Sequence, residues 1–392
     1  MPRFPQTAKH ARSVSHRVYS NLEQRARNKN EEIFALHVGD TYRDPIMAAR
    51  AEAQRTSEHP GLHRYAPVRG EPGLIDAFVA YVEKRHHETL DRDRIQVMSG
   101  ATAGLSIVCQ VLLEPGDEVL LPSPFWPLSR GIIATKGATP VQVPFYTRLD
   151  ERGFDPEAAL EGAVTERTVA LYINTPNNPS GRVLPEETIN AMLRVARRHD
   201  LWVFCDEAYE EYYFDREPPR AIWQHPSIRD RAIAFHTLSK TYGFAGARVG
   251  LTHGPAEVMG AIAGMQTFHT YCAPRPMQFG GIAALREGVA WVEESRALYR
   301  DAGYAAADAL GVARPEGGTF LFIDVGRHLT PDAEDCSAFL GRCADAGVLL
   351  TPGSSCGADY AKWVRLCFTS VPRARLGAAL ERLRPLFRTP VG

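Results

Sequence analysis

The chain has 392 residues, of which 44% are hydrophobic and 23% are charged, and its formal net charge is −1. A chain of this length is typical of two domains, and the composition is that of an ordinary globular protein. The near-zero net charge gives no global attraction to nucleic acid or to an anionic membrane. No apolar run approaches the roughly 20 residues of a membrane span. We therefore expect neither a nucleic-acid partner nor a membrane.

The first thirty residues are rich in Arg and Lys but contain no apolar segment, so they do not resemble a secretory signal. An organelle-targeting role is an alternative to a polar arm that leads into the first helix. The seven cysteines are odd in number, form no CxxC pair and lie mostly in apolar surroundings. This pattern favours buried free thiols in a reducing compartment over a zinc site. We expect a cytoplasmic location and no metal.

From about residue 70 to residue 255, helical and strand-like segments alternate. Helical spacing occurs over 73–88, 101–116 and 185–200. The strand-like segments are 94–100, 117–124, 139–145, 168–176, 201–209, 232–239 and 247–254. Several contain continuous apolar runs, as strands buried on both faces do. The alternation predicts an α/β fold with a mostly parallel sheet and helices on both faces.

Beyond about residue 280 the pattern changes to that of a smaller α+β unit. A long helical segment, 287–310, precedes a strand-like segment, a helix, two further strand-like segments and a last helix. The strand-like segments are 317–325, 347–353 and 363–370, and the last helix is 373–387. We expect an N-terminal arm and helix (1–40) that join this small domain (281–392), and a large domain between them (41–280).

Polar and aromatic side chains follow the strand-like segments. In an open α/β sheet, ligands bind beyond the carboxyl ends of the strands, so these residues are candidates for a binding site. They are Ser99, Gly100, Ala101 and Thr102, then Ser123, Phe125 and Trp126, then Asn174, Asn177 and Asn178, then Asp206 and Tyr209, and finally Thr237, Ser239 and Lys240.

Part of this set suits a phosphate group. The N-terminus of the helix that begins near Ala101 offers backbone N–H groups, Ser99 and Thr102 offer hydroxyls, and Arg248 offers a guanidinium.

The other part suits an aromatic ring that carries an aldehyde. Trp126 offers a flat face, and Asp206, at the end of an apolar strand, needs a cationic partner such as a protonated pyridine nitrogen. Tyr209 and Asn178 can hydrogen-bond a phenolic oxygen. Lys240 supplies an amine for a Schiff base. The ligand that these groups describe is pyridoxal 5′-phosphate (PLP).

The blocks that contain these residues resemble one enzyme family. They are "SGATAG" (99–104), "NTPNNPSG" (174–181), "CDEAY" (205–209) and "SKTYGFAGARVG" (239–250). In this order they resemble the fold type I PLP-dependent enzymes of the class I/II aminotransferase family, and the likeness runs from about residue 39 to 367. It implies a PLP-binding large domain with a mostly parallel seven-stranded sheet, a smaller α+β domain, and a homodimer with shared active sites.

The resemblance implies a role for each matching residue in transfer of an α-amino group between an L-amino acid and a 2-oxo acid by a ping-pong mechanism. Lys240 forms the Schiff base and moves the proton between the substrate α-carbon and the cofactor C4′. Asp206 holds the ring nitrogen protonated, which keeps the ring an electron sink. Tyr209 and Asn178 bind the ring oxygen O3′. Trp126 stacks on the ring, with Phe125 as the alternative.

The resemblance also implies which residues bind the substrate α-carboxylate and which bind the cofactor phosphate. Arg365, in "WVRLCF", matches the arginine that clamps the substrate α-carboxylate, and Gly39 brings backbone close to that carboxylate. Ser239 is either a phosphate contact or a cap at the strand end. The residues that match phosphate-binding positions are Ala101, Thr102, Thr237, Arg248 and, reaching over from the partner subunit, Tyr65.

The reaction has alternatives because one cofactor apparatus serves several chemistries. Transamination is favoured since every family position is filled by the expected residue type. A PLP-dependent lyase, oxidase or cyclopropane-forming synthase is the alternative, and a PLP-binding regulatory protein is a third hypothesis.

The substrate side-chain pocket is the least defined part. Dicarboxylate-specific members of the family use a second arginine from the partner subunit, and that place here holds Phe268 or His269. Arg275 follows several residues later, and whether it reaches the pocket is open. The neighbourhood of Phe268, His269 and Tyr271 favours a neutral or aromatic amino acid.

Overall fold

A computed structural model describes residues 20–55 and 58–388, and the first part of the basic N-terminal segment lies outside these ranges. The helices are α2 (Ser20–Lys29), α3 (Met47–Gln54), α4 (Pro72–His86), α5 (Ala101–Leu112), α6 (Pro127–Ala134), α7 (Pro156–Glu161), α8 (Glu186–Arg198), α9 (Leu238–Thr241), α10 (Ala256–His269), α11 (Arg275–Glu287), α12 (Val289–Leu310), α13 (Ser337–Asp345) and α14 (Arg373–Arg388). The strands are β1 (Phe34–Ala35), β2 (Ile95–Met98), β3 (Glu118–Ser123), β4 (Thr139–Pro144), β5 (Thr168–Asn174), β6 (Trp202–Asp206), β7 (Ala232–Thr237), β8 (Gly250–His253), β9 (Phe320–Asp324), β10 (Val348–Leu349), β11 (Thr351–Pro352) and β12 (Trp363–Cys367).

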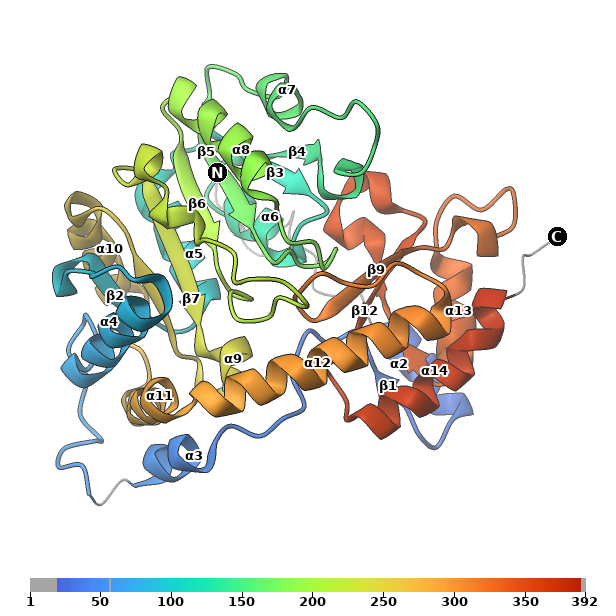
Figure 1. Ribbon diagram of the computed structural model, residues 1–392, viewed down its shortest axis with the longest axis horizontal. Coiled ribbons are helices and arrows are strands. Elements are labelled where there is room, and N and C mark those ends of the chain that lie inside the picture. Colours follow the sequence, from blue (N-terminus) through green and yellow to red (C-terminus); the bar gives the residue numbers. More distant parts are fainter. Residues whose placement is uncertain (1–19, 56–57, 389–392) are drawn as a thin grey trace, which may run out of the picture.

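The main sheet has seven strands in the order β2-β8-β7-β6-β5-β3-β4. Strands β4, β3, β5, β6 and β7 are parallel, and β8 runs antiparallel to both β7 and β2. Helices cover both faces of this sheet (Figure 1). The predicted α/β fold with a mostly parallel sheet is therefore confirmed.

The continuous apolar runs of the central strands are explained by two cores, one on each face. Successive side chains of a strand point to opposite faces. One core, which we call the α8 face, joins the strands to α4, α8 and α11, and it holds Leu171, Ile173, Val203 and Cys205. The other, which we call the α5 face, joins them to α5, α6 and α10, and it holds Ala170, Tyr172, Phe204 and Phe235.

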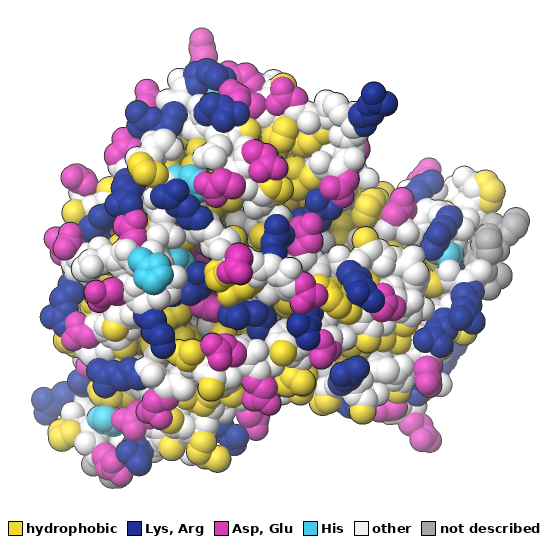
Figure 2. Space-filling view, viewed as in Figure 1, with side chains coloured by type: hydrophobic (Ala, Val, Ile, Leu, Met, Phe, Trp, Pro, Cys, Tyr) yellow, Lys and Arg dark blue, Asp and Glu magenta, His cyan; other side chains and the backbone are white. Residues whose placement is uncertain are grey.

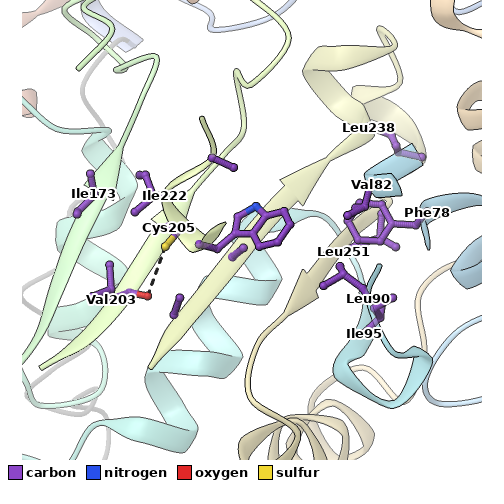
Figure 3. Close-up of a cluster of buried hydrophobic side chains, with 14 of the residues drawn as sticks. Phe78, Val82, Leu90, Ile95, Ile173, Val203, Cys205, Ile222, Leu238 and Leu251 are labelled. Atoms are coloured by element: carbon purple, nitrogen blue, oxygen red, sulfur yellow. Dashed lines mark hydrogen bonds between the residues drawn. The ribbon is translucent and has the colours of Figure 1, made fainter. Parts of the chain in front are cut away.

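Cys205 is a buried thiol that packs in the core of the α8 face. Its side chain lies beside Val203 and Ile222 in a cluster of apolar side chains, and its Sγ contacts the Val203 carbonyl oxygen at 3.7 Å (Figure 3). Burial raises the pKa of this thiol well above its ordinary value, so the thiol stays protonated. All seven cysteines are free, and six of them are buried.

A second, smaller body of structure is formed by the C-terminal part of the chain together with α2 and β1. Strands β11, β12 and β9 form an antiparallel sheet, and β1 pairs in parallel with β10. A separate core holds Phe34 and Leu36 together with side chains from α12, α13 and α14. The 22-residue helix α12 runs from beside α11 to this second body (Figure 1).

Several local predictions differ from the structure. The segment 347–353, expected as one strand, forms two short strands that pair in different sheets, because Leu350 separates β10 from β11. Helices α10 and α11 follow the last strand of the main sheet and were not expected from the sequence.

The surface view agrees with the near-zero net charge. On the face shown in Figure 2, Lys and Arg side chains are interspersed with Asp and Glu, and no broad patch of one sign is present on this face. Within residues 20–55 and 58–388, no helix combines the length and the apolar character that crossing a bilayer requires.

Candidate active site

A cavity of about 240 Å³ opens at the carboxyl ends of β5, β6 and β7. Asn174, Asp206 and Thr237 end these strands, and by alternation they continue the α5 face. The cavity is lined by Gly39, Ala101, Thr102, Leu105, Trp126, Tyr172, Asn178, Asp206, Ala208, Tyr209, Phe235, Thr237, Ser239, Lys240, Ala245, Arg248 and Arg365. Twelve of these residues were selected from the sequence.

Asp206 forms the floor of the cavity. The backbone N–H of Ala208 donates to Asp206 Oδ1 at 3.0 Å, and the hydroxyl of Tyr172 donates to Asp206 Oδ2. Burial raises the pKa of this carboxyl, and the two hydrogen bonds oppose that rise. Within the described chain no cationic side chain contacts the carboxylate, so a cationic ligand atom could pair with it.

Asn178 and Tyr209 stand side by side above this floor. The Asn178 amide donates to the Tyr209 hydroxyl at 3.5 Å, and its backbone N–H donates to Asn174 Oδ1 at 2.8 Å. Asn174 in turn donates to the Asp206 carbonyl at 3.0 Å. Burial raises the pKa of Tyr209, so its hydroxyl remains a hydrogen-bond donor at neutral pH. These contacts fix two polar groups that a ligand oxygen can use.

Lys240 enters the cavity from helix α9. Its Nζ donates to the Gly39 carbonyl at 2.5 Å and lies 3.9 Å from Asp40 Oδ1. Burial lowers the pKa of the amine, and the Asp40 charge opposes part of that effect. The lysine backbone is fixed from outside, since Tyr212 donates its hydroxyl to the Lys240 carbonyl at 2.9 Å. A fixed amine with a lowered pKa suits nucleophilic chemistry.

The N-terminus of α5 and Arg248 form the anion-binding end. Gly100 caps the helix at φ 83°, and an added Cβ there would lie 2.5 Å from an Arg248 guanidinium nitrogen. Arg248 itself has φ 53°, and it donates to the Ala245 carbonyl at 2.9 Å and to Ser239 Oγ at 3.4 Å. Thr237 caps α9 by accepting from the Ser239 N–H at 3.1 Å. Helix N–H groups and a guanidinium suit a phosphate.

Arg365 is a buried guanidinium without a carboxylate partner in the described chain. Its side chain is only 6% exposed and lies over the Phe320 ring. It donates to Asn178 Oδ1 and to the His37 carbonyl, both at 3.1 Å, and to Thr351 Oγ1 at 3.2 Å. Its Nε is buried and makes no hydrogen bond. This arrangement suits a carboxylate that arrives from the cavity.

Trp126 and Phe125, the two candidates for stacking on the ring, lie in different surroundings. Trp126 lines the cavity, whereas Phe125 is 2% exposed and belongs to the core of the α5 face. Ser99 is not among the cavity-lining residues.

A group of aromatic residues lies outside the cavity of this chain. Tyr65 is 76% exposed and Phe268 is 89% exposed, while the rings of Tyr65 and Tyr271 lie 4.5 Å apart. Arg275 is held by Glu71 at 2.5 Å and by the Gly61 carbonyl at 2.7 Å. The chain alone therefore does not bring these four residues to the cavity.

The chain also matches known proteins. The family model "Aminotransferase class I and II" matches residues 31–383. The chain belongs to this family. It is accordingly an aminotransferase, and the family to which it belongs is PLP-dependent.

Two curated relatives illustrate the likeness in sequence. The chain is 32% identical over 366 residues to the arginine–pyruvate transaminase AruH of Pseudomonas aeruginosa, covering 90% of this chain and 88% of that one. It is 31% identical over 371 residues to the aspartate/prephenate aminotransferase of Thermus thermophilus, covering 91% of each.

Solved structures show the same fold. The aspartate aminotransferase from Rhizobium meliloti matches with a TM-score of 0.89 at 25% identity, over 97% of this chain and 98% of that chain. The Thermus thermophilus aspartate aminotransferase bound to maleate matches with a TM-score of 0.84 at 27% identity, over 97% and 99%.

Some cavity residues were not identified from the sequence. They are Leu105, Tyr172, Ala208, Phe235 and Ala245. Tyr172 had a signal in the sequence, because it precedes Asn174 by two residues in one strand and therefore shares its face. Its contact with Asp206 depends on the pairing of Asn174 with Asp206 between β5 and β6, which the sequence does not specify.

Proposed function

We propose that this aminotransferase binds pyridoxal 5′-phosphate in the cavity and moves the α-amino group of a neutral or aromatic L-amino acid to a 2-oxo acid by a ping-pong mechanism. One observation carries the proposal. A single cavity gathers a buried carboxylate, an amine with a lowered pKa and two guanidinium groups. These are the groups that a phosphorylated pyridine aldehyde and an amino acid require.

The residues present fit the cofactor. Asp206 and Arg365 are buried charged groups that no oppositely charged side chain contacts within residues 20–55 and 58–388, and Arg365 Nε has no hydrogen-bond acceptor. Arg248 lies so close to Gly100 that a side chain at position 100 would collide with the Arg248 guanidinium. Buried charges are normally paired, so ligands of matching charge account for this arrangement.

When bound, the cofactor supplies an aldehyde for amines and a protonated ring that accepts the electron pair of the substrate Cα–H bond. Lys240 Nζ is the group placed to attach it, because burial favours the neutral, nucleophilic amine. The same nitrogen is the proposed carrier of the proton between the substrate α-carbon and the cofactor C4′.

The remaining cofactor contacts come from the floor and the walls. We assign Asp206 to the ring nitrogen, Tyr209 and Asn178 to the ring oxygen O3′, and Trp126 to the ring face. The phosphate is assigned to the groups at the α5 N-terminus and the start of α9, which are Ala101, Thr102, Thr237, Ser239 and Arg248.

Arg365 is the proposed clamp for the substrate α-carboxylate, supported by Asn178 and by the backbone at Gly39. The close approach at Gly39 requires glycine, since an added Cβ would lie 2.9 Å from the Phe320 ring. Phe320 also lies under the guanidinium, so one ring limits the position of both groups.

The preference for neutral or aromatic side chains is supported by the charges of the cavity. Among the described residues that line it, the cations are Lys240, Arg248 and Arg365, and each has a proposed role. No further cation is left for a second substrate carboxylate, and the carboxylate of Asp206 is assigned to the ring.

A homodimer with shared sites is part of the proposal. Tyr65, Phe268 and Tyr271 are exposed aromatic residues that the resemblance assigns to the partner's site. The seven free cysteines support the proposed cytoplasmic location, where thiols stay reduced.

The test is a half-reaction with purified protein loaded with cofactor. Single amino acids are added without any 2-oxo acid, and the near-visible absorption and the released 2-oxo acid are measured. We expect phenylalanine, leucine or glutamine to release one 2-oxo acid per subunit, faster than aspartate or arginine. Ammonia release in place of this product would favour a lyase or an oxidase. A large preference for aspartate would contradict the proposed substrate class.

A further inference from the structure

Tyr172 lines the cavity, although the proposed reaction assigns it no role. It lies on β5 and is 2% exposed. Its hydroxyl donates to Asp206 Oδ2, while the backbone of Ala208 occupies Oδ1. The two donors hold the carboxylate at both oxygens and so fix its plane at the cavity floor.

The hydrogen bond from the Tyr172 hydroxyl affects the protonation state of Asp206. Burial favours protonated Asp206, and a donor to the ionised form favours the carboxylate. Tyr172 can only be that donor, because burial and the nearby Asp206, Tyr146 and Tyr209 raise its own pKa well above the ordinary value. Among the groups around Asp206, the charge of His236, on the other face of the sheet, also favours the ionised form, and the neighbouring carboxyl of Glu207 interacts with Asp206 as well.

We propose that Tyr172 is a positioning residue that keeps Asp206 ionised, so that the shared proton stays on the cofactor ring nitrogen. This inference rests on the proposed function. If Tyr172 is removed, the ring N–H bond breaks and an O–H bond forms on Asp206, leaving a neutral ring beside a neutral acid. No proton is gained or lost overall. A neutral ring accepts electrons less well, so amino transfer slows.

The test uses the loaded enzyme and cofactor labelled with ¹⁵N in the ring. In the wild-type protein we expect the ring-nitrogen resonance at the position of a protonated pyridine. Tyr172→Phe should move it toward the unprotonated position. Tyr146→Phe is the matched control, because Tyr146 is an equally buried phenol that donates to the Asn174 carbonyl at 2.9 Å and does not contact Asp206.

Kinetics give a second readout. Tyr172→Phe should lower kcat about tenfold, on the scale of one hydrogen bond to a charged group, and leave KM nearly unchanged. A residue that only fills space would leave the ring-nitrogen resonance unchanged.

If the Tyr172→Phe variant does not fold, a fluorinated tyrosine at position 172 provides a second test. Replacing Tyr172 by 3,5-difluorotyrosine makes the phenol a stronger donor to Asp206, and the ring-nitrogen resonance should then remain at the position of a protonated pyridine. Wild-type protein that binds no cofactor would overturn the proposed function. Bound cofactor with the same ring-nitrogen resonance in wild type and in Tyr172→Phe, or with a resonance moved toward the unprotonated position in the difluorotyrosine protein, would overturn this inference alone.

Discussion

Asp206 and Glu207 are neighbours in the chain, and both are buried carboxyl groups, yet their surroundings differ. On the α8 side, Glu207 accepts the Ile222 N–H at 3.0 Å, and the adjacent Glu210 bonds His236 at 2.8 Å and His86 at 3.3 Å. On the cavity side, Asp206 has neutral donors and no cation in contact within the described chain. Glu207 also has no cation in contact within the described chain, so burial without an opposite charge does not by itself mark a functional site; Asp206 differs from it in lining the cavity.

Within the described chain, the two guanidinium groups of the cavity, Arg365 (buried) and Arg248 (exposed), have no carboxylate partner. Arg365 and Arg248 donate hydrogen bonds to carbonyl, amide and hydroxyl oxygens. Arg85 and Arg296, which do not line the cavity, both donate to the carboxylate of Glu211. We propose that Arg248 and Arg365 bind anionic groups of ligands, whereas Arg85 and Arg296 stabilise the fold through Glu211.

Lys240→Ala should have the largest effect. Loss of the amine that attaches the cofactor and moves the proton should slow amino transfer at least about a thousandfold. The variant should still bind cofactor without a covalent bond, through Asp206 and the α5 N-terminus. Equilibrium dialysis and the half-reaction measure both quantities, with Lys362→Ala as an exposed control. Turnover within tenfold of wild type would contradict the assignment.

Arg365→Lys tests the clamp with the charge retained. Lysine lacks the planar fork that binds a carboxylate through two hydrogen bonds, so kcat/KM for the amino acid should fall about tenfold to a hundredfold. The absorption spectrum of the bound cofactor should not change. Arg248→Lys is the matched comparison, since it should weaken cofactor binding instead. Cofactor loss from the Arg365 variant would show that the clamp is misplaced.

Asp206→Asn should weaken cofactor binding about tenfold to a hundredfold, because a charged hydrogen bond is lost. It should also change the stability of the cofactor-free protein. Burial raises the Asp206 pKa in the folded state above the ordinary 3.8, so the folded protein binds this proton more tightly than the unfolded chain. Stability then falls as the pH rises from 3.8 through the raised pKa, and the variant should lack this fall. Urea unfolding across pH measures it.

Glu207→Gln should have the smallest effect on activity, less than about twofold, because the side chain contacts no ligand group. Burial, reinforced by the Glu210 charge, raises the Glu207 pKa to about 8. Its contribution to stability should therefore decline between the ordinary 4.5 and about 8, and glutamine should remove that decline while keeping the Ile222 contact. A large loss of kcat would place Glu207 in the active site and break the comparison.

The sequence predicts the parts that one chain builds locally. Apolar runs of the strands predict a sheet buried on both faces, and the residues that end those strands predict the cavity. The division of 347–353 between two sheets depends on partners far away in the sequence. The contact of Tyr172 with Asp206 depends on strand register. The places proposed for Tyr65 and Phe268 lie in the site of a second subunit, and both side chains are exposed in the single chain.

The most direct test of the account is to reduce the cofactor-loaded protein with borohydride and to map the modified peptide by mass spectrometry. Reduction makes the bond between the cofactor carbon and a lysine nitrogen permanent. The account predicts one pyridoxyl group per subunit, on Lys240. A protein that gains no such group after incubation with the cofactor, or that carries it on another lysine, would contradict the central claim.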